Sequence, residues 1–448
     1  MPQGDAMDMP DALDALFPSH LATLADRTSA ALAAAGAGAL VVGAGSPRFR
    51  FLDDQPDPFF VNPHFKAWAP VLDAPGSFVI FVPGHRPALL FHQPEDYWHK
   101  PPPLPTGGWV SSFDVKVIRN PAEARGQVPA RAVFVGEPFA GCDDWGFSAM
   151  NPPALLNRLH YARAAKTPYE IACMRRAAAA GARAHRAAAT AFAAGASEYE
   201  IHLAFLAATG HTEAELPYPN IIALNEGAAI LHNHEFRRTH PAVRRSMLID
   251  AGAQFRGYAC DITRTHAAAN SPFKDLVAGV DALEQQLCAM VKPGVAYPEI
   301  HLAAHRLIAE VLVEQGIVNC SAQAAVEGDV TSVFFPHGVG HLLGLQVHDV
   351  GGHQASAEGG EVSPPARHPY LRLTRRLEAG TVVTIEPGVY FIDLLLDRAQ
   401  QDGRGRSIDW GTVADLAPYG GVRIEDDVVA TASGPDNLTR AAFAALGA

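Results

Sequence analysis

Five residues that lie far apart in the sequence have side chains suited to binding divalent metal ions. Four are carboxylates and one is an imidazole: Asp250, Asp261, His341, Glu386 and Glu425. Oxygen-rich ligation with a single imidazole favours Mn²⁺ over Zn²⁺, which prefers nitrogen and sulfur. Two divalent ions would balance the four carboxylates, and a water bridging them would ionise to hydroxide at neutral pH. The sequence therefore predicts a dinuclear metal centre.

The first two acids lie on a predicted β-hairpin. Two short β-prone runs are separated here by a Gly-bearing stretch. We expect the turn to be centred between Phe255 and Arg256, which makes Asp250 and Asp261 cross-strand partners with Cβ atoms about 4.5–5.5 Å apart. Two like charges at that distance repel each other unless a cation lies between them.

The second half of the chain repeats this pattern. An apolar strand end, an acid and then a Gly occur at 249–252 and again at 385–388. Alternation along the next strand puts Arg423 and Glu425 on one face. The imidazole comes from the Gly-rich stretch 335–349. These features indicate two related half-domains that contribute two acids each.

The elements that must position these residues divide between two predicted domains, 1–160 and 161–448. The first is expected to be a small α/β domain. Its predicted elements are a helix over about 15–36 and strands at 39–42, 77–82, 88–91 and 132–136. The second is expected to be an α+β domain.

Helix-start signals mark the second domain. Thr167-Pro168-Tyr169-Glu170 combines an N-cap residue, a Pro at the first helical position and a Glu three residues after the cap, so a helix is predicted to about Ala193. Ser197 and Glu200 form a second capping box. Further helices are predicted at 271–291 and 297–316, and the polar stretches 355–368 and 397–409 are predicted to be surface loops.

Bulk composition excludes several classes of partner. The chain has 448 residues, 48% of them hydrophobic, and a net charge of -12. This charge argues against a nucleic-acid or anionic-membrane partner, because both need clustered cationic residues. The five cysteines are scattered and never form Cys-x-x-Cys, which favours a reduced, cytoplasmic setting. No apolar run approaches the roughly 20 residues needed to span a bilayer, so we expect a soluble protein.

Six motifs in order resemble one known family. They are Leu216-Pro217-Tyr218-Pro219-Asn220 through His232, the two-Asp hairpin, His337-Gly338-Val339-Gly340-His341, Leu371-Arg372-Leu373-Thr374-Arg375, Thr384-Ile385-Glu386-Pro387-Gly388 and Val422-Arg423-Ile424-Glu425. The chain resembles the M24 metallopeptidase family, and within it the bacterial Xaa-Pro dipeptidases. The resemblance implies an α+β fold: a small creatinase-like α/β domain that dimerises and forms the pocket rim, then a "pita-bread" catalytic domain with an internal pseudo-twofold repeat.

The resemblance also implies roles for the five ligands. It assigns Asp250 to one metal, His341 and Glu386 to the other, and Asp261 and Glu425 as bridges. The implied reaction is hydrolysis of Xaa-Pro dipeptides by a hydroxide that bridges the two metals and attacks the Xaa-Pro carbonyl. Glu386 would carry a proton towards the leaving proline nitrogen.

Neighbouring residues would assist. By the resemblance, His348 and His232 polarise the substrate carbonyl or stabilise the oxyanion. Arg372, with His337 beside it, would bind the substrate carboxylate through its guanidinium fork. The remaining assignments are Arg423 as a residue that orients Glu425, Tyr218 and Tyr297 as pocket walls, and Trp98 as a contact from a partner subunit in a homodimer.

Other functions remain open at this point. An aminopeptidase P would cleave longer peptides with proline in second place, and the same fold hosts metal-free creatinases and binding proteins. Each acid taken alone is also typical of a structural role, in which a buried carboxylate pairs with an arginine. The joint occurrence of all five ligand types favours the metal centre. A bridging hydroxide could also attack phosphorus, so hydrolysis of organophosphorus esters is an expected side activity.

Overall fold

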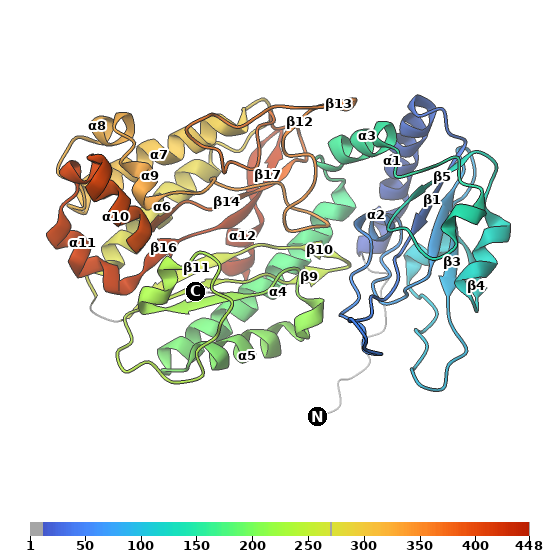
Figure 1. Cartoon of the computed structure of the whole chain (residues 1–448), viewed down its shortest axis with the longest axis horizontal. Helices are drawn as coiled ribbons and strands as arrows, with labels where there is room; N and C mark the ends of the chain where they lie inside the picture. The colour runs from blue at the N-terminus through green and yellow to red at the C-terminus, as the bar shows by residue number, and fades with distance from the viewer. Residues whose placement is uncertain (1–11, 269–270, 448) are drawn as a thin grey trace. The chain divides into compact units, whose positions relative to one another are not determined.

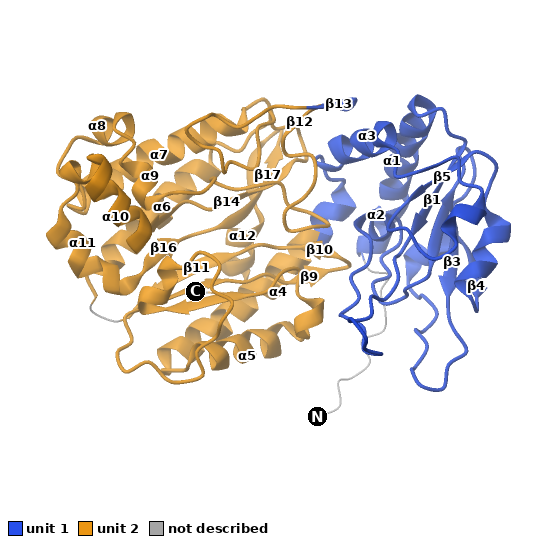
Figure 2. Cartoon of the chain, in the orientation of Figure 1, with its two compact units in different colours: residues 1–173, 356–360 blue, residues 174–355, 361–448 orange. Residues whose placement is uncertain are grey.

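The chain divides into two compact units (Figure 2). The computed structural model describes residues 12–268 and 271–447. Unit 1 comprises residues 1–173 and 356–360, and unit 2 comprises residues 174–355 and 361–448. Across the described residues, none of the helices combines the length and the apolar character that crossing a bilayer requires.

Unit 1 is built on one six-stranded mixed sheet, with the strands in the order β4-β3-β2-β1-β5-β6 (Figure 1). The strands are β1 (Ala39–Gly43), β2 (Phe78–Phe81), β3 (Ala88–His92), β4 (Asp114–Ile118), β5 (Ala132–Val135) and β6 (Ala149–Met150). β1 runs parallel to β5 and antiparallel to β2. Every residue of these three strands is buried, which explains why they form continuous apolar runs in the sequence.

Three α-helices accompany this sheet: α1 (Ala12–Ala34), α2 (Pro63–Trp68) and α3 (Pro153–Arg163). The predicted N-terminal helix and the four predicted strands are confirmed, as is the small α/β architecture. β4 and α3 were not predicted. β4 has only one buried residue, Ile118, so it lacks the apolar run that marks the central strands.

The predicted helices of the second half are also confirmed. They are α4 (Pro168–Ala193), α5 (Glu198–Thr209), α6 (Phe273–Cys288) and α7 (Tyr297–Glu314). Both predicted capping boxes form. Glu170 Oε2 accepts a hydrogen bond of 2.8 Å from the Thr167 backbone N–H, and Glu200 Oε2 accepts one of 2.8 Å from Ser197. These reciprocal bonds satisfy backbone donors that a helix start leaves without an intrahelical partner.

Two three-stranded sheets carry the acids of unit 2. One has the order β11-β8-β7, with β7 (Ile221–Leu224), β8 (Ser246–Asp250) and β11 (Thr263–Ala267). The other has the order β14-β17-β18, with β14 (Val382–Ile385), β17 (Asp426–Thr431) and β18 (Gly434–Asn437). An antiparallel bridge between Thr263 and Glu425 joins them, with a 3.1 Å bond from the Glu425 N–H to the Thr263 carbonyl. The two halves therefore present their acids along one seam.

The remaining elements are short. They are β9 (Gln254–Phe255), β10 (Tyr258–Ala259), β12 (Gln354–Ser356), β13 (Gly359–Glu361), β15 (Gly388–Tyr390), β16 (Gly421–Arg423), α8 (Ala322–Glu327), α9 (Thr331–Phe334), α10 (Asp393–Asp402), α11 (Trp410–Leu416) and α12 (Leu438–Ala445). The prediction of a surface loop over 397–409 is wrong, because α10 occupies its first half. This helix buries Leu396 and Ala399 and ends at Gly403, whose φ is 90°. Its polar residues are the outer face of an amphipathic helix.

Candidate metal centre

A cavity of about 760 Å³ in unit 2 brings the predicted residues together. All five predicted metal ligands line it. So do six of the other predicted site residues: Tyr218, His232, His337, His348, Arg372 and Arg423. The cavity therefore collects side chains from both three-stranded sheets and from the Gly-rich stretch that follows α9.

The hairpin that carries the two aspartates turns one residue later than predicted. Tyr258 pairs with Phe255, so the two-residue turn consists of Arg256 and Gly257. Both have positive φ, 50° and 82°, as a type I′ hairpin turn requires, and Gly adopts that conformation readily. The expected centre between Phe255 and Arg256 is therefore wrong.

As a consequence, Asp250 lies opposite Thr263 and not opposite Asp261. A shift of one residue at the turn moves every cross-strand partner by two positions, and two positions preserve the face on which a side chain lies. The two aspartates are thus diagonal neighbours that still face the same cavity.

Each aspartate is held by a different donor. The Tyr218 hydroxyl donates to Asp261 Oδ1 at 2.5 Å. Arg423 Nη2 donates to Asp250 Oδ2 at 2.6 Å. The other oxygen of Asp250, Oδ1, is buried and has no hydrogen-bond partner among the described residues. A buried carboxylate oxygen without a donor is costly unless a cation meets it.

His341 presents one ring nitrogen to the carboxylates. Its Nδ1 donates to the Leu342 carbonyl at 3.0 Å, which fixes the ring. Nε2 lies 3.4 Å from Asp261 Oδ2 and 3.7 Å from Glu386 Oε1. Burial opposes a charge here, but the hydrogen bond with Asp261 and the charge of Glu386 together raise the pKa of His341. The site thus draws positive charge, as a proton or a metal ion, to the point where Nε2 faces the acids.

In the Gly-rich stretch, the backbone at Gly340 lies very close to Thr384 and Tyr297. Its φ is 149°, and a β-carbon there would lie 2.1 Å from the Thr384 carbonyl oxygen and 2.3 Å from the Tyr297 hydroxyl. No residue with a side chain fits this position. The backbone N–H of His341 donates to Thr384 Oγ1 at 3.1 Å, so this contact fixes the imidazole against β14.

The two glutamates complete the cluster. Glu425 Oε2 accepts a 2.6 Å hydrogen bond from the Thr263 hydroxyl. Burial, and then the neighbouring acids, raise the pKa of Glu425 well above its ordinary value. Burial also raises the pKa of Glu386 to about 7. In the absence of a cation this cluster cannot hold all of its negative charges.

These residues fit divalent metal ions. Asp261, His341 and Glu425 each place a potential ligand atom within 4.8 Å of the others. Asp250 adds its partnerless oxygen, and Glu386 adds a second carboxylate 3.7 Å from Nε2 of His341, after Asp261 at 3.4 Å. Carboxylate oxygens with one imidazole form a donor set typical of hard or borderline divalent ions.

Arg423 has a different partner from the one expected. The predicted continuous strand is interrupted, because β16 ends at Arg423 and β17 begins at Asp426. Arg423 Nε donates to Thr263 Oγ1 at 3.2 Å, and Thr263 in turn donates to Glu425. Arg423 therefore contacts Asp250 directly and reaches Glu425 only through Thr263, a residue that the sequence analysis did not identify.

Tyr390 is a second residue that was not identified. Its hydroxyl accepts a 3.0 Å bond from Arg423 Nη1 and lies 2.9 Å from His337 Nε2. His337 Nδ1 donates to the Gly338 carbonyl at 2.7 Å, so both ring nitrogens are engaged. Burial, and then the charge of Arg423, lower the pKa of His337 to about 3, so its ring is neutral at pH 7. The only sequence signal was the position of Tyr390 four residues after Glu386.

His348 and His232 face the cavity as neutral rings. The His348 ring packs edge-on against that of His341, with centroids 4.5 Å apart. Burial, and then His341, lower the pKa of His348 to about 4, and burial also lowers the pKa of His232. Arg372 lies exposed in the lining and makes no ion pair within the part of the chain that the structure describes.

Two predicted site residues do not line this cavity. Tyr297 is completely buried at the start of α7, and its hydroxyl donates to the Thr384 carbonyl at 2.7 Å. Its ring occupies the space beside Gly340, so its prediction as a pocket wall is wrong. Trp98 belongs to unit 1 and is 76% exposed, packed against Tyr97. Its contact with a partner subunit stays a prediction.

Comparisons with known proteins point to the same family over nearly the whole chain. The family profile described as the Xaa-Pro dipeptidase N-terminal domain matches residues 15–161, and that of metallopeptidase family M24 matches residues 172–432. A protein named Xaa-Pro dipeptidase from Stenotrophomonas maltophilia (strain K279a) is 51% identical over 96% of this chain and 98% of its own length. One of the same name from Xanthomonas campestris pv. campestris (strain B100) is 49% identical over 97% of this chain and 99% of its own length.

Solved structures share the fold. Proline aminopeptidase P II from Yersinia pestis aligns with a TM-score of 0.70 at 24% identity, over 96% of this chain and 99% of that one. Zn-substituted aminopeptidase P from Escherichia coli, in complex with product, aligns with a TM-score of 0.69 at 22% identity, over 96% and 98%. This likeness confirms the expected two-part fold, with a small N-terminal domain and a pita-bread domain.

Proposed function

Because this chain belongs to metallopeptidase family M24 and is a hydrolase of that family, we propose that its cavity in unit 2 cleaves Xaa-Pro dipeptides. The two relatives described above carry the name Xaa-Pro dipeptidase and match almost the whole chain at about half identity. The supporting observation in the molecule is that four carboxylates line one cavity, two of them facing Nε2 of His341, with Asp250 Oδ1 left without a donor among the described residues.

The five ligands would hold two divalent ions. We assign Asp250 to one ion, His341 and Glu386 to the other, and Asp261 and Glu425 to both. When bound, such ions lower the pKa of a water and polarise the substrate carbonyl. The oxygen-rich donor set favours Mn²⁺. Tyr218 and Arg423 would keep the two aspartates oriented, since each donates to one of them.

The residues of the chain divide the remaining tasks. Glu386 lines the cavity, and its carboxylate would move a proton to the proline nitrogen as the amide bond breaks. His348 and His232 would donate hydrogen bonds to the oxygen that gains charge, which a neutral imidazole N–H can do without any change of protonation.

Recognition of a dipeptide needs a cation for its carboxylate. Arg372 lies in the cavity lining with no acid of the described chain beside it, so its guanidinium fork is available. Tyr218 would form part of the wall. His337 would assist Arg372 only by exchanging its contact with Tyr390 for the substrate. We favour dipeptides over longer peptides because Arg372 would bind the carboxylate of a proline that ends the substrate.

An aminopeptidase P activity is the second candidate, because solved structures with that name share the fold. The two candidates differ in the position of the substrate carboxylate. A tripeptide Xaa-Pro-Xaa carries it one residue farther along, beyond the reach expected of Arg372. Equal rates on the tripeptide and on Xaa-Pro would favour the aminopeptidase.

The test begins with protein stripped of metal by a chelator. We expect no hydrolysis of Xaa-Pro until divalent metal is restored, with Mn²⁺ giving the highest rate and two ions bound per chain. If the purified protein holds no divalent ion and added Mn²⁺ restores nothing, the alternative of a metal-free binding protein is correct. Phosphotriester hydrolysis measured on the same samples tests the proposed side activity.

We further propose a cytoplasmic homodimer. Cys142, Cys260 and Cys288 are buried free thiols, which supports a reducing compartment. The exposed Tyr97 and Trp98 of unit 1 support contact with another subunit. Sedimentation analysis of the wild-type protein and of Trp98→Ala tests the second statement, because a monomeric wild type would contradict it.

A further inference from the structure

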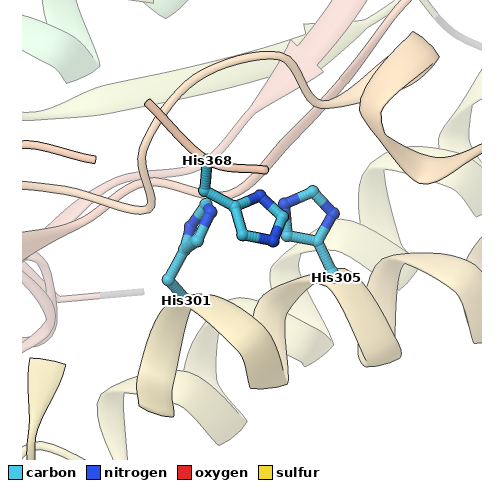
Figure 3. A group of neighbouring side chains, drawn as sticks. All are labelled: His301, His305 and His368. Atoms are coloured by element: carbon cyan, nitrogen blue, oxygen red, sulfur yellow. The ribbon is translucent and has the colours of Figure 1, made fainter. Parts of the chain in front are cut away.

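Three histidines form a second cluster that the proposed reaction does not use (Figure 3). His301 and His305 lie four residues apart on α7, so they point from the same face of the helix. His368 comes from the loop above that face and points between them. The three ring centroids are 4.4 to 4.8 Å apart, and each ring offers a nitrogen within 4.8 Å of the others.

His301 is the partnerless member of the cluster. It is 1% exposed, and neither of its ring nitrogens has a hydrogen-bond partner among the described residues. A neutral imidazole carries one N–H donor and one lone pair, and burying both without partners is costly. If His301 only packed against its neighbours, its two ring nitrogens would gain nothing that a phenylalanine ring would not provide.

The His305 ring is oriented with a nitrogen to spare. His305 Nδ1 lies 2.9 Å from the Thr331 hydroxyl, which fixes the ring and leaves Nε2 available. A hydrogen bond at the far nitrogen is the usual way in which a metal-binding histidine is oriented. Burial lowers the pKa of His301 to about 2 and that of His305 to about 4, so both rings have a lone pair at neutral pH.

The charged side chains around the cluster offset one another. Burial lowers the pKa of both His305 and His368, and Asp329 opposes that shift at each ring. Arg367 acts on the pKa of these rings in the opposite direction to Asp329. It lies 3.8 Å from the Asp329 carboxylate, which also pairs with Arg404 at 3.4 Å. No carboxylate belongs to the group of potential ligands itself.

We propose that His301, His305 and His368 bind one divalent transition-metal ion, with Zn²⁺ as the preferred ion and water as the fourth ligand. Three imidazoles without a carboxylate form a set typical of Zn²⁺, Co²⁺ or Ni²⁺, whereas Mn²⁺ and Mg²⁺ prefer oxygen. The chain would then hold two chemically different metal sites, one rich in oxygen at the cavity and one rich in nitrogen on α7.

The second site would act through the loop that carries His368. Pro369, Tyr370 and Leu371 line the cavity directly after it, and Arg372 follows them. A metal that joins His368 to α7 therefore fixes one end of this wall. On the other side, the Phe335 ring contacts both helical histidines and also His337, so it separates this cluster from the cavity.

The experiment counts metal in the full-length protein. Metal-free wild type, His368→Ala and the control His240→Ala are saturated with Mn²⁺ to occupy the cavity site, and are then titrated with Zn²⁺. His240 is an exposed histidine of unit 2 whose Nε2 pairs with Glu200 at 2.9 Å. We expect wild type and the control to retain one Zn²⁺ more than His368→Ala by elemental analysis. Equal zinc content in all three proteins would overturn the proposal.

A spectroscopic readout separates this site from the cavity centre. Four-coordinate Co²⁺ absorbs visible light far more strongly than six-coordinate Co²⁺. The Glu425→Gln protein, which we expect to lose the cavity ions, should still show the strong band after addition of one equivalent of Co²⁺. His305→Asn should abolish that band while leaving the melting temperature of the metal-free protein within a few degrees. A band that survives His305→Asn and His368→Ala would also overturn the proposal, whatever the outcome for dipeptide hydrolysis.

Discussion

Glu425 and Asp426 are neighbours in the sequence, both buried, yet they face opposite environments. Glu425 faces the cavity, where the acids Asp261, Glu386 and Asp250 act on it more strongly than the one arginine, Arg423. Asp426 faces away, where Arg264 Nη2 and Arg440 Nε donate to its two oxygens at 2.6 and 2.5 Å. The pKa values accordingly move apart. Burial and the other acids raise that of Glu425, whereas at Asp426 the arginines outweigh burial and lower it.

This difference shows what marks a candidate metal site. Glu284, Cys288 and Asp426 satisfy the same distance criterion as Asp261, His341 and Glu425. Around Asp426, however, the chain supplies its own cations, and Asn437 donates a further bond of 2.8 Å. Among the described residues, the cation that acts on the Glu425 carboxylate is Arg423, which is engaged with Asp250, while Arg264 contacts only the Glu425 backbone carbonyl. A cluster of acids indicates metal when the fold leaves its charge unbalanced.

The largest expected effect comes from neutralising the acid on the cavity side. Glu425→Gln should reduce turnover on the order of 10³-fold, which corresponds to about 4 kcal/mol of transition-state stabilisation. Bound metal should fall as well. The melting temperature of the metal-free protein should not decrease, because burial already raises the pKa of Glu425 and Gln keeps this side chain neutral. A variant that binds both ions and turns over like wild type would remove Glu425 from the site.

Neutralising Asp426, the acid that faces away from the cavity, should instead lower the stability of the metal-free protein. Asp426→Asn takes from Arg264 its acid partner and leaves Arg440 with only Asp281 and Glu284, and breaking a buried pair such as Arg264–Asp426 costs about 3–5 kcal/mol of the free energy of unfolding. The matched control is Asp281→Asn, which removes a half-exposed partner of Arg440 at 2.8 Å and should cost less than about 1 kcal/mol. Denaturant unfolding of the metal-free proteins measures both. Equal costs would show that the network is not what stabilises this side.

An intermediate effect is expected at Arg372, the arginine of the cavity that would pair with the carboxylate of the substrate. Arg372→Ala should raise KM for Xaa-Pro about tenfold to a hundredfold, because a hydrogen bond to a charged group contributes about 1.5–3 kcal/mol. The rate at saturation should change little. A Xaa-Pro amide, which lacks the carboxylate, should be cleaved equally by both proteins, and a loss with this substrate too would contradict the assignment.

The smallest effect concerns pH. Burial, and then Asp426, raise the pKa of Glu284 from 4.5 to about 8. Between these two values the folded protein binds more protons at this residue than the unfolded chain, so the free energy of unfolding falls as the pH rises through that window. Glu284→Gln cannot titrate and should flatten this decline in the metal-free protein. Parallel pH profiles of wild type and variant would exclude Glu284 as the source.

The sequence predicted those parts of the molecule that depend on neighbouring residues. Capping residues predicted the starts of α4 and α5, and apolar runs predicted the strands of unit 1. Asp250 and Glu386 were found because each follows an apolar strand and precedes a Gly by two residues, and this local pattern can be recognised without knowledge of the fold.

Distant contacts were not predictable in the same way. The break between β16 and β17 gave Arg423 a different partner, and Tyr297 lies buried with its hydroxyl against Gly340 and the Thr384 carbonyl. The pairing of Asp426 with Arg264 joins residues 162 positions apart. For the histidine cluster, the spacing of His301 and His305 was an available signal, but nothing in the sequence connects either of them with His368.

The two-residue turn at Arg256 and Gly257 makes the centre sensitive to the length of the hairpin. Side chains of a strand point alternately to its two sides, so inserting or deleting one residue between Asp250 and Asp261 would leave one acid inside the cavity and send the other to the opposite side. A change of two residues would preserve the alternation. Changes in hairpin length by an even number of residues therefore keep both aspartates on the cavity face. Changes by an odd number move one of the two aspartates away from the metal centre.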